Sequence, residues 1–155
     1  VEPVIFAAAR GAHGGVYDAF RASYLGFAAL VVTGDLAGAA ALFHSHWGTG
    51  EAFGDLPEKT RAYMVDRIHH IVAQNPVLLD DAAGVLRAGG LEAVQVPVLL
   101  IEGAQSPAII DAVHAALAAR LPNVTRLSVP GAGHMVSITH AQAIVGQVQG
   151  HLDAC

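Results

Sequence analysis

The sequence predicts an α/β fold, in which a parallel sheet carries an inserted helical region. In residues 93–155 the apolar pattern indicates strand, helix, strand and helix in turn. This order implies parallel strands joined by right-handed crossovers. Between residues 16 and 92, apolar side chains instead recur at helical spacing. The chain is 54% hydrophobic and only 14% charged, which excludes a disordered protein and indicates that some apolar surface is covered by a partner.

Residues 1–15 are expected to form the end of a core strand followed by a hinge. Val1–Phe6 is short and apolar, as in a buried strand. The segment Gly11–Gly15, which contains His13, is rich in glycine. It lacks the lysine and the Gly-x-Gly-x-x-Gly spacing of phosphate-binding loops, and a hinge into the helical region is therefore the prediction.

Residues 16–92 are expected to form a compact helical insert. Ala40, Phe43 and Trp47 have the spacing of one helix face. A proline in a first helical turn loses no hydrogen bond, so the stretch around Pro57 predicts the start of another helix. The breaks between helices are predicted at turn-forming segments: Gly34-Asp35, Gly48-Thr49-Gly50, Asp55-Leu56-Pro57 and Asn75-Pro76.

Residues 93–155 are expected to form a β-α-β-α unit. The run Val96–Ile101 is apolar throughout, which is typical of a strand buried on both faces. A helix over Pro107–Arg120, a strand over Val124–Val129 and a closing helix over Ser137–Leu152 are predicted to follow. With the opening strand, the sheet would have only three strands. Its apolar edge is therefore expected to be covered by a partner chain or by a missing N-terminal half of the protein.

The segment Gly131-Ala132-Gly133-His134 directly follows the second predicted strand. Its glycines permit a tight turn that places His134 at the carboxyl end of the strand, where ligands gather in open α/β sheets. A neutral imidazole there can accept a proton from a hydroxyl nucleophile and later return it. The alternative from the residues alone is a histidine that caps the next helix or bonds within its loop.

The order of these motifs closely resembles the C-terminal end of the α/β-hydrolase fold. That family carries a Gly-x-x-Asp or Gly-x-x-Ser-Pro turn after its next-to-last strand, as in Gly103-Ala-Gln-Ser106-Pro107, and a catalytic histidine after its last strand. Val1–Phe6 is similar to the sixth strand, after which the family inserts a helical lid. The resemblance implies a lid over residues 16–92 and a core unit over residues 93–155 that carries the catalytic histidine.

The chain departs from the family pattern at the acid and at the nucleophile. Ser106 stands where an aspartate is common, and the resemblance to members with an acid after the sixth strand implies Glu2 as the acid. Asp80 or Asp81 would be next if Glu2 were only a polar residue near the chain end. The nucleophile elbow Gly-x-Ser-x-Gly is absent. The chain is therefore expected to supply lid, acid and base, and to need a Ser or Asp nucleophile from elsewhere.

Four apolar side chains are predicted to bind a substrate beneath the lid: Phe43, Trp47, Phe53 and Met135. They indicate a small to medium apolar substrate, although aromatic residues at helical spacing are also typical of an ordinary core.

No cofactor and no metal are predicted. The pairs His44/His46 and His69/His70 lack the i,i+4 spacing with which two histidines share a helix face. His114, His140 and His151 are predicted to be surface or packing residues.

A net charge of −5 argues against nucleic-acid binding. The longest apolar run, Tyr24–Val32, is too short to span a membrane. Cytoplasm is the default expectation for location. The lone Cys155 cannot form an internal disulfide.

Two functions from different classes follow. The first is an esterase-like α/β hydrolase in which His134 is the general base and Glu2 the acid. The alternative is a catalytically incomplete hydrolase module that binds an apolar ligand or a partner chain.

Overall fold

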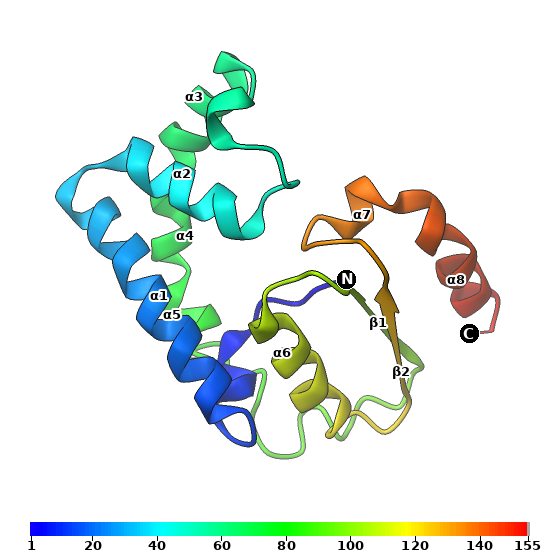
Figure 1. The fold of residues 1–155 in the computed structure, drawn as a ribbon. Coiled ribbons are helices and arrows are strands. Elements are labelled where there is room, and N and C mark those ends of the chain that lie inside the picture. The colour runs from blue at the N-terminus through cyan, green and yellow to red at the C-terminus, as the bar shows by residue number, and fades with distance from the viewer. Residues whose placement is uncertain (155) are drawn as a thin grey trace.

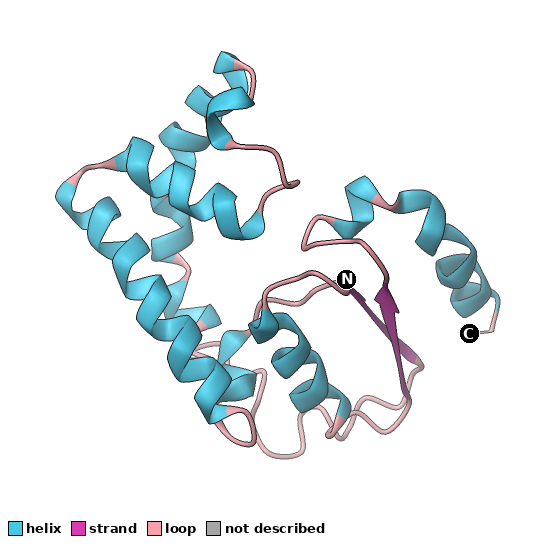
Figure 2. Ribbon diagram, viewed as in Figure 1, coloured by secondary structure: helices cyan, strands magenta, loops and turns pink. Residues whose placement is uncertain are grey.

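The computed structural model describes residues 1–154 and has a mixed α/β architecture (Figures 1 and 2). Its elements in chain order are η1 (Phe6–Arg10), α1 (Gly14–Thr33), α2 (Leu36–Trp47), η2 (Phe53–Asp55), α3 (Glu58–Arg67), α4 (His69–Ala73), α5 (Asn75–Leu78), β1 (Val98–Gly103), α6 (Ala108–Ala118), β2 (Val124–Val129), α7 (Val136–Thr139) and α8 (Ala141–Asp153).

Strands β1 and β2 pair in parallel, from Val98 opposite Val124 to Gly103 opposite Val129. Because side chains alternate along a strand, the sheet presents two faces. Leu100 packs on one face with apolar side chains of α6. Ile101 packs on the other face with residues of α7 and α8. Helices α6 and α8 accordingly lie on opposite sides of the strands in Figure 1, the layering expected of buried parallel strands.

Helices α1–α5 gather in a separate layer beside η1 and α6 (Figure 1). Phe27 of α1, Ala39 and Ala40 of α2, and Ile68 form the buried centre of this layer. The turn between α1 and α2 follows its sequence closely. Gly34 ends α1 with a φ of 85°, and the Asp35 carboxylate accepts a 2.9 Å hydrogen bond from the Gly38 amide at the start of α2.

The helical region is shorter than the predicted range of 16–92, because its last helix ends at Leu78. Residues 79–97 form turns instead. The Asp81 carboxylate accepts hydrogen bonds of 2.8 and 2.9 Å from the amides of Val85 and Leu86. The glycines at 84 and 89 have positive φ angles, a conformation that interrupts a helix.

The predicted opening strand is also corrected. The segment 1–5 lies alongside β1 but does not form a strand. The backbone hydrogen bond that joins the two runs from the Glu2 amide to Ile101 O, at 2.9 Å. Glu2 has a φ of 42°, which turns the chain away from an extended ladder. The sheet within residues 1–154 therefore has two strands rather than three.

The β-α-β-α unit lies close to its predicted bounds. Strand β2 has the predicted range, while β1 begins two residues later than expected and extends to Gly103. The single closing helix is divided in two at His140, whose φ of −127° is not helical. Among residues 1–154, no helix combines the length and apolar character needed to cross a membrane.

Candidate active site

Three polar side chains meet at the carboxyl ends of the two strands: Glu2, Ser106 and His134. Glu2 is placed there by its backbone bond to β1. Ser106 lies in the turn that follows β1, and His134 lies in the loop that follows β2. The N-terminus lies beside this edge of the sheet in Figure 1. Residues more than 100 positions apart in the sequence thus form one hydrogen-bonded group.

Both carboxylate oxygens of Glu2 are hydrogen-bonded. Oε1 accepts from the Gly103 amide at 2.7 Å and from the Ser106 hydroxyl at 2.5 Å. Oε2 is bonded to Nδ1 of His134. Glu2 is buried, with 5% of its surface exposed, whereas the imidazole of His134 is partly exposed. The carboxylate is therefore held rigidly, and the ring it orients remains open to the surroundings.

The pKa of the Glu2 carboxyl is lowered from its ordinary value. Burial is the largest single influence and raises it, but the hydrogen bonds from His134, Ser106 and Gly103 and the charge of His134 together outweigh burial. Glu2 is thus ionised at neutral pH and accepts a hydrogen bond from the Nδ1–H group of His134. In that tautomer Nε2 carries the lone pair that a general base needs.

Close packing of two loops positions His134. The Ala104 amide donates to Val129 O at 2.9 Å, and the Gln105 amide donates to Ala132 O at 2.8 Å. A Cβ at Gly103 would stand only 2.4 Å from the carbonyl oxygens of Ala132 and Gly133. Position 103 therefore requires glycine for the histidine loop to pass over the end of β1.

His134 lines two cavities of opposite character. The first has a volume of about 200 Å³ and is mostly apolar, with Phe6, Phe20 and Trp47 among its lining residues. The second has a volume of about 490 Å³ and is more polar; Gln105 and His140 are among the residues that line it. The imidazole thus stands between an apolar and a polar space.

The predicted substrate-binding residues divide between these cavities. Phe43 and Trp47 line the apolar one, and the Trp47 ring meets the His134 ring edge-on with centroids 4.8 Å apart. Phe53 and Met135 line the polar cavity instead. The prediction that these four residues bind a substrate stays a prediction.

The alternative acids lie elsewhere. Asp80 is paired with Arg10 at 2.7 Å, and Asp81 caps the turn described above. Among residues 1–154, no serine hydroxyl is hydrogen-bonded to His134. Glu2 is therefore the carboxylate that contacts the imidazole.

The histidine pairs make local contacts. Nε2 of His44 is 3.0 Å from Glu51 O, Nδ1 of His46 is 2.9 Å from Leu42 O, and the rings of His69 and His70 lie 4.1 Å apart. In the part of the chain that the structure describes, no three His, Cys, Asp or Glu side chains are grouped as metal ligands.

Sequence reasoning missed a charged cluster on the α6 face of the sheet, in which Glu102 and His114 are buried. Arg126 binds Glu102 at 2.9 Å and Asp111 at 2.5 Å. His114 is fully buried, with Nδ1 3.2 Å from Glu102. Burial, followed by the positive charge of Arg126, lowers the pKa of His114 to about 4. The imidazole is therefore neutral, and Arg126 balances Glu102. The glutamate within an apolar strand was the available signal.

The role of Ser106 was also missed. Its hydroxyl supports the Glu2 carboxylate directly. The available signal was the position of Ser106, because the α/β-hydrolase family that the sequence resembles commonly has the acid there.

No family model, curated protein or solved structure matches this chain. Its function therefore has to be inferred from the site itself.

Proposed function

We propose that this protein is an esterase-like hydrolase of the α/β-hydrolase type, with His134 as general base and acid and Glu2 as the residue that orients it. The observation that carries the proposal is the Glu2–His134 pair at the carboxyl end of parallel strands, between an apolar and a polar cavity. A ring nitrogen held by a buried carboxylate, with the other nitrogen unbonded, is the arrangement that general-base catalysis requires.

The proton transfers follow from this geometry. Where the nucleophile is a serine, Nε2 of His134 takes the proton of the attacking hydroxyl. Where it is an aspartate that has formed an ester with the substrate, Nε2 takes a proton from the water that attacks this ester. The resulting imidazolium is stabilised by the ionised Glu2, which stays unprotonated. His134 then gives the proton to the departing alcohol. Where a serine is the nucleophile, His134 next takes a proton from the water that attacks the acyl-serine and returns it to the serine oxygen, which frees the acid product. The proposal also requires a serine or aspartate nucleophile, and the sequence contains no Gly-x-Ser-x-Gly motif that would supply it.

The two cavities define how a substrate would lie. An apolar acyl group fits the cavity lined by Trp47 and Phe43, where it is removed from water. The departing alcohol then points into the polar cavity beside Gln105 and His140, where its hydroxyl finds hydrogen-bond partners. The scissile bond lies at the His134 imidazole, which lines both spaces.

The test is hydrolysis of p-nitrophenyl butyrate by the protein as its gene encodes it in full. We expect His134→Ala to lower kcat by about 10³-fold or more, while KM changes little. His70→Ala is the matched control, because His70 is exposed on α4 and lines none of the cavities described. Turnover by His134→Ala close to that of the control would overturn the assignment of His134.

A second candidate is a module that binds an apolar ligand or a partner chain without catalysis. The specific observation in its favour is the absence of the nucleophile elbow beside large apolar cavities. Hydrolysis that depends on His134 would exclude it. If a series of esters is not hydrolysed and an apolar probe binds saturably, the binding module replaces the hydrolase as the function of this protein.

A further inference from the structure

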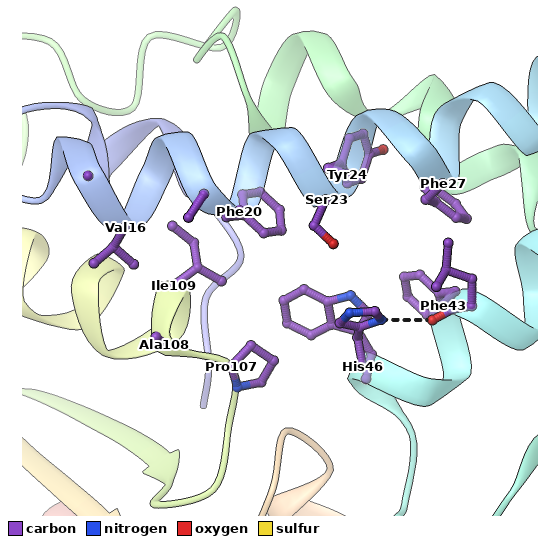
Figure 3. Close-up of a pocket in the computed structure, with 14 residues that line it drawn as sticks. Val16, Phe20, Ser23, Tyr24, Phe27, Phe43, His46, Pro107, Ala108 and Ile109 are labelled. Carbon is purple, nitrogen blue, oxygen red and sulfur yellow. Dashed lines mark hydrogen bonds between the residues drawn. The ribbon is translucent and has the colours of Figure 1, made fainter.

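A third cavity, of about 490 Å³, lies between α1, α2 and the start of α6. Figure 3 shows Phe20, Tyr24 and Phe27 of α1 along one wall, with Pro107 and Ile109 on the α6 side and Phe43 on the α2 side. Its lining is almost wholly apolar, and His134 is not among its residues. It is therefore a separate space from the one beside the imidazole.

The two apolar cavities share four aromatic side chains as a common wall: Phe20, Tyr24, Phe43 and Trp47. Trp47 is central to this wall, because its ring contacts Phe6, Phe20 and Phe43 at centroid distances of 5.8, 6.3 and 6.3 Å. On another side the same ring touches His134. A chain that begins at the imidazole and continues past Trp47 would enter the larger cavity.

The smaller cavity alone is too small for most organic ligands. Ligand pockets usually have volumes of about 300–1,000 Å³, and this cavity has about 200 Å³. A methylene group is similar in size to a water molecule, which occupies roughly 30 Å³ in the liquid. The smaller cavity thus holds on the order of six methylene groups, and a longer chain needs the second space.

We propose that the larger cavity binds the distal part of a linear apolar chain whose reactive end lies at His134, so that the substrate is an acyl compound whose chain is longer than about six carbons. The occupant is the substrate's own chain, because the two cavities adjoin along the shared aromatic wall and the smaller one holds only its proximal part. The inference deepens the proposed function and rests on it for the identity of the reactive end.

The experiment measures binding rather than hydrolysis, so that it can fail independently of the proposed function. 1-Alkanols of about four to twelve carbons are titrated into the protein by calorimetry. In the 155-residue chain, Trp47 is the only tryptophan, so its fluorescence reports whether they bind at the shared wall. Each buried methylene should raise affinity about fourfold, and we expect this increase to continue through decanol.

Ser23→Leu is the decisive variant. Ser23 is exposed on α1 and lines only the larger cavity, and leucine is a good helix former. The leucine side chain narrows the larger cavity, so it should weaken the binding of decanol and leave butanol binding unchanged. Ala19→Leu, at a second exposed position lining the same cavity, gives an independent measurement. Ala22→Leu adds the same apolar surface outside the cavities described and should bind decanol as the natural protein does.

Two results would overturn the inference: a plateau near six carbons in the natural protein, or decanol binding that Ser23→Leu and Ala19→Leu leave unchanged. Neither result bears on the role of His134, which is tested by the hydrolysis assay. Conversely, His134→Ala should keep the chain-length dependence of alkanol binding even if it destroys hydrolysis.

Discussion

On the proposed function, replacement of Glu2 by glutamine is expected to remove most of the hydrolytic activity and to leave the fold intact. In the natural protein Nδ1 of His134 donates to the carboxylate, so Nε2 keeps its lone pair. The oxygen of a glutamine can still accept the bonds from Gly103 and Ser106. Its NH₂ group would then face Nδ1 and donate to it. The ring would have to carry its proton on Nε2, where it can no longer accept one.

The loss of charge adds to this change of tautomer. An imidazolium formed about 4 Å from the carboxylate gains about 4 kcal/mol at an effective dielectric constant of about 20. Loss of that stabilisation in the transition state corresponds to about 10³-fold in kcat. With the unfavourable tautomer included, we expect a reduction that approaches 10⁴-fold.

The assay compares kcat and KM for p-nitrophenyl butyrate at neutral pH, where the lowered pKa of Glu2 keeps the carboxyl ionised. Glu58→Gln is the matched control, because Glu58 is an exposed residue of the first turn of α3. That variant should match the natural protein to within roughly twofold. A kcat for Glu2→Gln within about tenfold of the natural value would refute the assignment of Glu2 as the residue that orients the base.

Three further expectations concern stability. Gly103→Ala should lower the free energy of unfolding in urea by about 1–3 kcal/mol, because the new Cβ meets two carbonyl oxygens of the histidine loop; Gly146→Ala, with open space around it, should not destabilise the protein. His114 has a pKa of about 4 in the folded state, against an ordinary value of 6.5. As the pH drops from 6.5 to 4, the unfolded state binds the proton first, so the free energy of unfolding falls by roughly 3 kcal/mol. His114→Leu should flatten that part of the stability curve, and an unchanged slope would contradict a neutral buried imidazole. Asp35→Ala should cost about 1 kcal/mol through the lost cap of α2, seen as a lower midpoint of thermal unfolding; an unchanged midpoint would show that the cap contributes nothing.

The strands and α6 could be predicted because their signals are local. An unbroken β-branched run and a repeat at helical spacing depend on neighbouring residues alone. The end of the helical region depends on different contacts. Leu79 and Leu86 keep the seven-residue spacing of one helix face, but the Asp81 carboxylate binds backbone amides that a helix would need, and Gly84 adopts a positive φ.

The opening segment differs from its prediction for a non-local reason. Val1–Ile5 has the composition of a strand, but a strand exists only when a neighbour supplies a ladder of hydrogen bonds. Here the Glu2 amide donates one backbone hydrogen bond, to Ile101 O of β1, and the Gly103 amide of β1 bonds to the Glu2 side chain instead. Composition alone does not reveal how a segment aligns with its neighbouring strand. For the same reason, the sequence could place Trp47 and His134 in one substrate site but could not predict the contact between their rings.

The serine at position 106 and the glutamate at position 2 depend on each other. Oε1 of Glu2 lies 2.5 Å from the Ser106 hydroxyl, so an aspartate at 106 would place a second carboxylate against the first. Two carboxylates at that distance cannot both stay ionised, and one pKa would rise strongly. A serine instead donates a hydrogen bond to Glu2 and helps to lower its pKa. Glu2 also holds a φ of 42°, a conformation that costs about 1–3 kcal/mol in a residue with a side chain. The hydrogen bonds to Ser106, Gly103 and His134 offset that cost. A serine at 106, where the α/β-hydrolase pattern that the sequence resembles commonly has an aspartate, is therefore what a carboxylate arriving from position 2 would require.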